Sequence, residues 1–161
     1  MTTIAERPTV TEFDVRNPAD GRVVAGVPID TAESVAAKAA ALRTAQPAWD
    51  ALGPRGRKEW LLKLQDWLLD NYDEITDVLQ SETAKVRADA SVEVPFAVDL
   101  LRYWANNAEK FLADEHPTPH NPLAKVKRIA TVYRPYPVVG VITPWNFPLA
   151  MPALDVVPAL A

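Results

Sequence analysis

The sequence of 161 residues contains no cysteine and only two histidines. The missing thiol excludes disulfides, thiolate-bound metal ions and a cysteine nucleophile anywhere in this chain. No window approaches the run of about 18 apolar residues that a membrane-spanning helix needs, and the opening "MTTIAERPTV" lacks the apolar core of a secretory signal. These absences predict a cytoplasmic protein without a membrane partner.

Positive charge is scarce as well. Seventeen lysines and arginines face 21 aspartates and glutamates, which gives a formal net charge of −4, and no block of consecutive basic residues occurs. This balance argues against nucleic acid as a partner and leaves small neutral or anionic molecules. The two histidines, His116 and His120, lie in "HPTPH", whose prolines prevent a helix that would place both rings on one face. We therefore predict a solvated loop there and no metal site.

The apolar content, 48% of the residues, is sufficient for one domain with a core. From Phe13 to Ile29, two β-prone runs flank "NPADG", which is typical of a hairpin or meander. From Thr31 to about Leu112 the apolar period is helical, with Thr31 as an N-cap and "GPRGR" (53–57) as a break. We expect the apolar stripes of these helices, and the five tryptophans, to form the core.

The last stretch has the β-branched content of strands, from Lys125 to Ile142. Its end, "VVGVI", is apolar on both faces, which predicts a strand inside a parallel sheet. A helix is expected from about Leu149, and it is still apolar at Ala161 without a closing glycine. We expect the chain to be the front part of a longer protein, cut within the first strand-and-helix unit of an α/β domain.

The most informative segment is "GVITPWNFPLAMP", Gly140–Pro152. It holds one amide, Asn146, between two aromatic residues, with Pro144 and Pro148 on either side. Burying an amide without a partner is costly, while the prolines fix the backbone and remove donors. The pattern predicts an amide that is directed at a ligand. The alternative is a buried amide that is satisfied by the neighbouring backbone.

This segment resembles the P-W-N-[FY]-P motif of the aldehyde dehydrogenase superfamily, which ends the first strand of the NAD-binding domain. Upstream, "NPADG", "ETAK" (82–85), "RYWA" (102–105) and "VYRPYPVVG" are also similar to family patterns. Apart from the first dozen residues, the resemblance covers the whole chain, but only about the first third of a typical member. Many members have a lysine where this chain has Asp155. An acidic residue at this position resembles the pattern of the succinate semialdehyde dehydrogenase-like branch.

The resemblance implies an α/β fold: the N-terminal part of an aldehyde dehydrogenase-like fold, with a helical region and β-hairpins leading into the first strand and helix of a Rossmann-like NAD-binding domain. The implied divisions are a flexible N-terminus (1–12), a hairpin and helical region (13–124), an oligomerisation-type strand (125–137) and the start of the NAD-binding domain (138–161). The family uses such strands to pair subunits, which implies a homo-oligomer for the full-length protein.

The resemblance also implies a reaction, in which an aldehyde is oxidised to a carboxylic acid with NAD or NADP through a thiohemiacetal on a cysteine. Asn146 would donate its amide to the oxyanion, and donors of this type contribute roughly 3 to 4 kcal/mol in the transition state. The implied cofactor-binding residues are Ile142, Thr143, Pro144 and Trp145, with no metal. The nucleophile, the general-base glutamate and the phosphate loop lie downstream in the family.

Two alternatives follow from the residues themselves. The apolar helical stripes are also compatible with a helical protein-interaction module. The absence of a thiol is compatible with an inactive truncated fragment.

Overall fold

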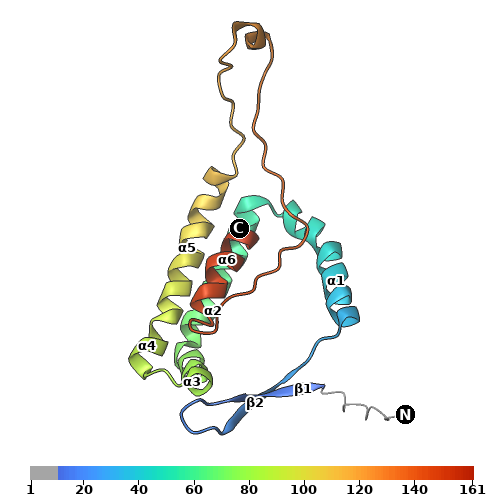
Figure 1. Cartoon of the computed structure of the whole chain (residues 1–161). Coiled ribbons are helices and arrows are strands. Elements are labelled where there is room, and N and C mark those ends of the chain that lie inside the picture. The colour runs from blue at the N-terminus through green and yellow to red at the C-terminus, as the bar shows by residue number, and fades with distance from the viewer. Residues whose placement is uncertain (1–10) are drawn as a thin grey trace, which may run out of the picture.

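The computed structural model describes residues 11–161 and begins with an antiparallel hairpin (Figure 1). Strand β1 (Glu12–Arg16) pairs with β2 (Val23–Pro28). The connecting turn is closed by Asn17, whose side-chain oxygen accepts a hydrogen bond from the backbone of Ala19 at 2.8 Å. The hairpin predicted around "NPADG" is confirmed. The flexible N-terminus expected over 1–12 lies mostly outside the described residues, and within it Glu12 already belongs to β1.

Six α-helices follow in the described chain. The predicted N-cap is confirmed, because the hydroxyl of Thr31 accepts a hydrogen bond from the backbone of Ser34 at 3.2 Å. Gly53, with φ of +61°, begins the second helix at the predicted break. Within residues 11–161, no helix has both the length and the apolar character needed to cross a membrane. The bounds are α1 (Ala32–Ala51), α2 (Gly53–Asp70), α3 (Tyr72–Thr83), α4 (Arg87–Ser91), α5 (Glu93–Phe111) and α6 (Ala150–Leu160).

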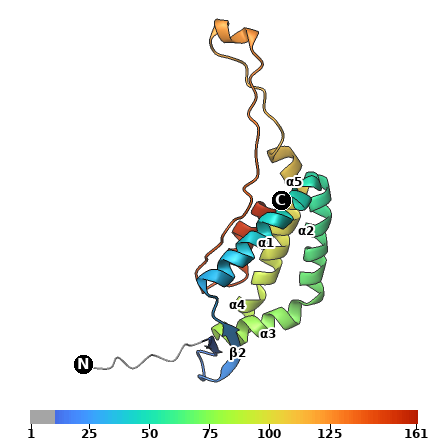
Figure 2. The same ribbon diagram turned by 90° about the vertical axis from the view of Figure 1, so that its right-hand side faces the viewer.

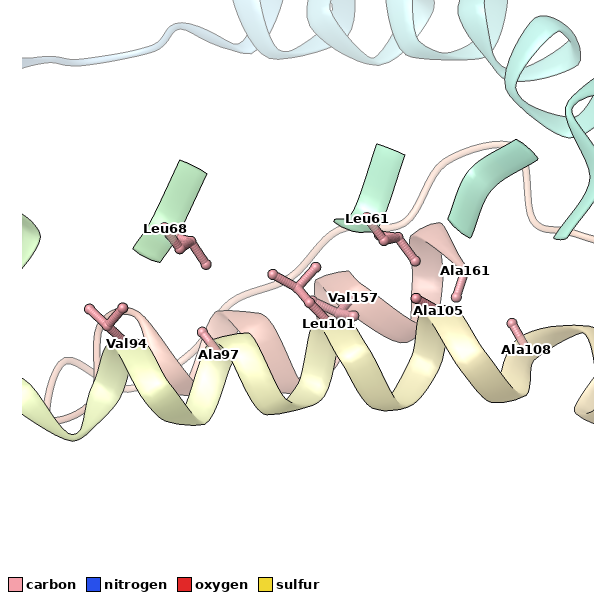
Figure 3. Close-up of a cluster of buried hydrophobic side chains, with 9 residues drawn as sticks. All are labelled: Leu61, Leu68, Val94, Ala97, Leu101, Ala105, Ala108, Val157 and Ala161. Carbon is pink, nitrogen blue, oxygen red and sulfur yellow. The ribbon is translucent and has the colours of Figure 1, made fainter. Parts of the chain in front are cut away.

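The main core lies where α2 and α6 pack on α5 (Figure 3). The buried face of α5 is rich in alanine, and these small side chains let the neighbouring helices approach closely. Leu101, at the centre of that face, is 1% exposed. The core therefore joins α6 to α2 and α5, which lie before the long connection between Phe111 and Ala150. Its members are Leu61, Leu68, Val94, Ala97, Leu101, Ala105, Ala108, Val157 and Ala161.

The expectation that the apolar stripes and all five tryptophans are buried is wrong in part. Trp60 and Trp67 are 53% and 55% exposed, although Leu61 and Leu68 beside them are buried. A helix turns by about 100° per residue, so α2 can bury the two leucines against α5 while it leaves the two tryptophans facing outward. Helix α1 has no buried residue, and Val35 and Leu42 of its stripe are 54% and 55% exposed.

Between α5 and α6 the chain leaves the bundle as a long arm and returns (Figures 1 and 2). A short 3-10 helix, η1 (Pro122–Val126), forms its tip. The two branches meet at one antiparallel bridge between Glu115 and Thr131. The hydroxyl of Tyr133 donates to Glu115 at 2.9 Å, and this hydrogen bond raises the pKa of Tyr133.

The strands predicted over Lys125–Ile142 are not formed in the described chain, apart from that single bridge. Lys125 and Val126 belong to η1, and from there to Ile142 the backbone pairs with other backbone of residues 11–161 only at that bridge. A strand requires a continuous neighbouring partner. The local sequence composition indicates an extended backbone, but it does not indicate which other segment would pair with it. The boundary at residue 137, between the oligomerisation-type strand and the start of the NAD-binding domain, remains a prediction.

Candidate active site

The segment with Asn146 forms a turn between the returning arm and α6 (Figure 1). Pro144 and Pro148 flank the turn, and the backbone of Met151 donates to the carbonyl of Phe147 at 3.0 Å, which begins the helix. Asn146 is exposed, and its amide forms no hydrogen bond with any other residue of the described range. Within residues 11–161, its N–H donors are therefore unoccupied.

The four residues expected to contact a cofactor precede Asn146 directly. Ile142 and Trp145 are almost fully exposed, at 101% and 81%, and Pro144 is exposed too. Thr143 is half-buried. Together with the amide they form one continuous stretch of mainly apolar surface at the end of the extended segment.

A buried carboxylate binds the backbone of this turn where the turn enters α6. Glu93 begins α5 and is 1% exposed. Its Oε2 accepts hydrogen bonds from the backbone N–H groups of Leu149 at 3.0 Å and Ala150 at 3.1 Å. Its Oε1 lies 2.5 Å from Nζ of Lys85. That ammonium also lies 4.1 Å from the centre of the Phe147 ring.

Sequence reasoning missed Glu93 and gave Lys85 no role beyond its place in "ETAK". The available signal was a carboxylate within the apolar run "SVEVPFAV", since charged side chains are rarely buried without a partner. The other acidic residues noted in the sequence are less enclosed: Glu82 is half-buried near the end of α3, and Asp155 is exposed on α6.

Several clear pKa shifts belong to surface pairs away from the turn. The pKa of Asp30 is lowered by hydrogen bonds from Lys38 and Ser34 at the start of α1. The pKa of Arg87 is raised, chiefly by its hydrogen bond to Asp77 and also by Asp73. These exposed pairs connect neighbouring elements of the bundle and contribute little to stability individually.

No group of three potential metal ligands lies together within residues 11–161. His116 and His120 are both exposed in the arm. The Nδ1 atom of His116 is 3.3 Å from the carbonyl oxygen of Ile129 on the opposite branch.

Comparison with known proteins gives the class of this chain. The model of the aldehyde dehydrogenase family matches residues 4–161. The chain therefore belongs to the aldehyde dehydrogenase family, and it corresponds to the N-terminal portion of its members.

The relatives include semialdehyde dehydrogenases. The chain is 36% identical over 148 residues to glutarate-semialdehyde dehydrogenase of Pseudomonas putida, covering 91% of this chain and 30% of that protein. It is 31% identical over 149 residues to the NADP(+) succinate-semialdehyde dehydrogenase GabD of Escherichia coli, covering 92% and 30%. The chain thus spans about three-tenths of the length of these relatives.

Solved structures confirm the expected fold class, the N-terminal part of an aldehyde dehydrogenase-like fold. The crystal structure of aldehyde dehydrogenase 21 from Physcomitrella patens, in complex with the reaction product succinate, superposes with a TM-score of 0.83. The identity is 29%, and the match covers 96% of this chain and 32% of that one.

Proposed function

We propose that this chain is the N-terminal segment of an NAD- or NADP-dependent aldehyde dehydrogenase in which Asn146 stabilises the oxyanion of a thiohemiacetal. The observation that carries the proposal is an exposed amide that has no hydrogen-bond partner among residues 11–161, held on a proline-flanked turn in a chain of this family. The cysteine that forms the thiohemiacetal and the glutamate that acts as base would come from the remainder of the enzyme. We call this segment joined to that remainder the complete enzyme.

Asparagine suits the proposed role because its amide donates a hydrogen bond without carrying charge. When the thiolate attacks the aldehyde carbon, the carbonyl oxygen gains negative charge, and a donor that is already oriented stabilises it without reorganising. An exposed amide whose backbone is stiffened by Pro144 and Pro148 meets this requirement. The amide would act together with a second donor from the remainder of the enzyme.

The exposed residues before Asn146 fit a dinucleotide by their chemistry. Ile142 and Trp145 offer the apolar surface that a flat nicotinamide ring requires, and the hydroxyl of Thr143 can donate or accept a hydrogen bond. We propose that they and Pro144 contact NAD or NADP in the complete enzyme. When bound, the dinucleotide supplies the hydride acceptor for the oxidation.

We further propose that the substrate is a semialdehyde, a short aldehyde with a carboxylate at its far end. The support comes from the relatives, among which glutarate- and succinate-semialdehyde dehydrogenases are prominent. A site that binds the carboxylate discriminates strongly against analogues without it, because its polar groups are then left unpaired.

The substrate assay compares succinate semialdehyde, glutarate semialdehyde and uncharged butanal with the complete enzyme and each dinucleotide. We expect kcat/KM for one of the semialdehydes to exceed that for butanal by at least about tenfold. Equal values for butanal and both semialdehydes would contradict the substrate class. No oxidation of any of the aldehydes would contradict the proposed activity itself.

The proposal includes a homo-oligomer formed through the arm. Two apolar residues near the tip of the arm, Leu123 and Val126, are 82% and 86% exposed. The extended backbone after η1 also presents hydrogen-bonding groups that a neighbouring strand could pair with. A second subunit would cover both features.

The same exposed surfaces predict that the 161-residue chain by itself is poorly soluble or self-associates. An apolar groove of about 810 Å³ also lies open between α1, residues 133–141 and the end of α6. Unpaired extended backbone and large apolar patches favour aggregation. Size-exclusion chromatography with light scattering should give masses above that of a monomer. A monodisperse monomer that unfolds cooperatively would contradict this expectation.

A further inference from the structure

Helix α6, which follows the Asn146 turn, has an unusual start. The first N–H groups of a helix lack partners within it and are normally satisfied by a nearby capping side chain. Leu149 occupies the N-cap position, and its side chain cannot accept a hydrogen bond. Glu93 takes that role from another helix, since its Oε2 accepts the N–H groups of Leu149 and Ala150, 56 and 57 residues further along the chain.

The carboxylate of Glu93 is held in turn by Lys85. A buried charge is costly unless it is paired and hydrogen-bonded, and here the ammonium lies 2.5 Å from Oε1 while the helix start lies against Oε2. The position of Lys85 above the Phe147 ring brings the same ammonium into contact with the residue directly after Asn146. The two charged side chains therefore contact Phe147, Leu149 and Ala150.

These contacts hold the turn that carries Asn146. Pro144 and Pro148 stiffen the turn. Glu93 attaches it to the bundle, because Glu93 belongs to α5, the central helix of the core (Figure 3). We propose that Glu93, supported by Lys85, is a positioning residue that aims the Asn146 side chain at the oxyanion. This inference rests on the proposed function of Asn146.

The geometry requires a carboxylate in particular. Both of its oxygens accept hydrogen bonds: Oε2 from two backbone N–H groups and Oε1 from the ammonium of Lys85. Glutamine has nearly the same shape, but one of its ends is an NH2 group, which can only donate. In Glu93→Gln, one donor would therefore face either the ammonium of Lys85 or the N–H groups of the turn. The turn should shift without the loss of buried volume that a smaller residue would cause.

The test is a double-mutant cycle in the complete enzyme, with Glu93→Gln, Asn146→Ala and the two together. A misplacement of about 1 Å in a catalytic group can lower the rate by 10²-fold, so we expect Glu93→Gln alone to lower kcat by roughly tenfold to a hundredfold. NAD(P) affinity, measured by titration, should change little. In the Asn146→Ala background, Glu93→Gln should lower kcat by no more than about twofold, because the group that it positions has gone.

A matched control is available at the other end of α6. Arg57 is also a buried charge that binds this helix, and its Nε donates to the carbonyl of Ala161 at 2.7 Å. We expect Arg57→Met to lower the melting temperature but to change kcat by no more than about twofold. If Glu93→Gln does not fold, Lys85→Met replaces it in the cycle, since it leaves the carboxylate on the helix start and removes only the ammonium.

The outcomes separate the two claims. If Asn146→Ala lowers kcat and Glu93→Gln lowers it by the same factor with and without Asn146, the positioning role is overturned. The same conclusion follows if Arg57→Met lowers kcat as much as Glu93→Gln does. If Asn146→Ala leaves kcat unchanged, the proposed function of Asn146 fails, whatever Glu93→Gln does.

Discussion

Replacing Asn146 with alanine should lower the aldehyde-oxidation rate of the complete enzyme by roughly 10² to 10³. The substitution removes one hydrogen-bond donor from the oxyanion and leaves the thiol and the residues before the turn in place. The backbone should keep its course, because Pro144 and Pro148 flank the turn and Glu93 holds the start of α6. The measurement is steady-state turnover at saturating aldehyde and dinucleotide.

The control for this substitution is another exposed asparagine. Asn106 lies on α5, where its side chain accepts from Lys58 at 2.8 Å and donates to the carbonyl of Arg102. Asn106→Ala removes the same chemical group away from the turn and should change turnover by no more than about twofold. If Asn146→Ala were no slower than Asn106→Ala, the amide of Asn146 would have no part in catalysis.

The 161-residue chain assayed alone should not oxidise aldehydes above background. The proposed reaction begins with attack by a thiolate on the aldehyde carbon, and this chain has no cysteine to supply one. We would follow dinucleotide reduction by absorbance, with the chain and the complete enzyme at equal concentration. Reduction of NAD or NADP that depends on both the aldehyde and the isolated chain would contradict the mechanism, because no covalent intermediate on cysteine could then be required.

Features of the fold that depend on neighbouring residues were predictable from the sequence. The turn at "NPADG", the cap at Thr31 and the break at Gly53 all rest on the conformational preferences of a few adjacent residues. Each occurs where the sequence indicates. The start of α6 after Leu149 also lies where the sequence indicates, but its cap is supplied by the distant Glu93.

Features that depend on distant partners were not predictable in this way. An apolar stripe indicates a helix, but it does not say which side another helix covers, so the exposure of Trp60 and Trp67 was missed. The extended conformation near "VVGVI" was indicated by its composition, whereas strand pairing depends on backbone that this chain does not place beside it.

The candidate site shows the same difference between features that depend on adjacent residues and features that depend on distant ones. Asn146 was identified from its immediate neighbours and from the family motif that they form, and the structure leaves its amide exposed. Glu93 was not identified, because its role depends on contacts with Leu149, Ala150 and Lys85, which come together only in the folded chain. A buried carboxylate has a physical requirement for such partners, but sequence alone does not say where they lie.

The central claim is that Asn146 donates a hydrogen bond to a developing negative charge, and Asn146→Asp tests it most directly beside Asn146→Ala. Aspartate keeps the shape of the side chain but, when ionised, places a negative carboxylate where the oxyanion forms. Turnover and NAD(P) affinity are measured for both variants at neutral pH. We predict that the aspartate variant is at least as slow as the alanine variant, with the NAD(P) affinity of the alanine variant close to that of the parent enzyme. An aspartate variant that is faster than the alanine variant, or a loss of cofactor affinity in proportion to the loss of rate in the alanine variant, would contradict the oxyanion role.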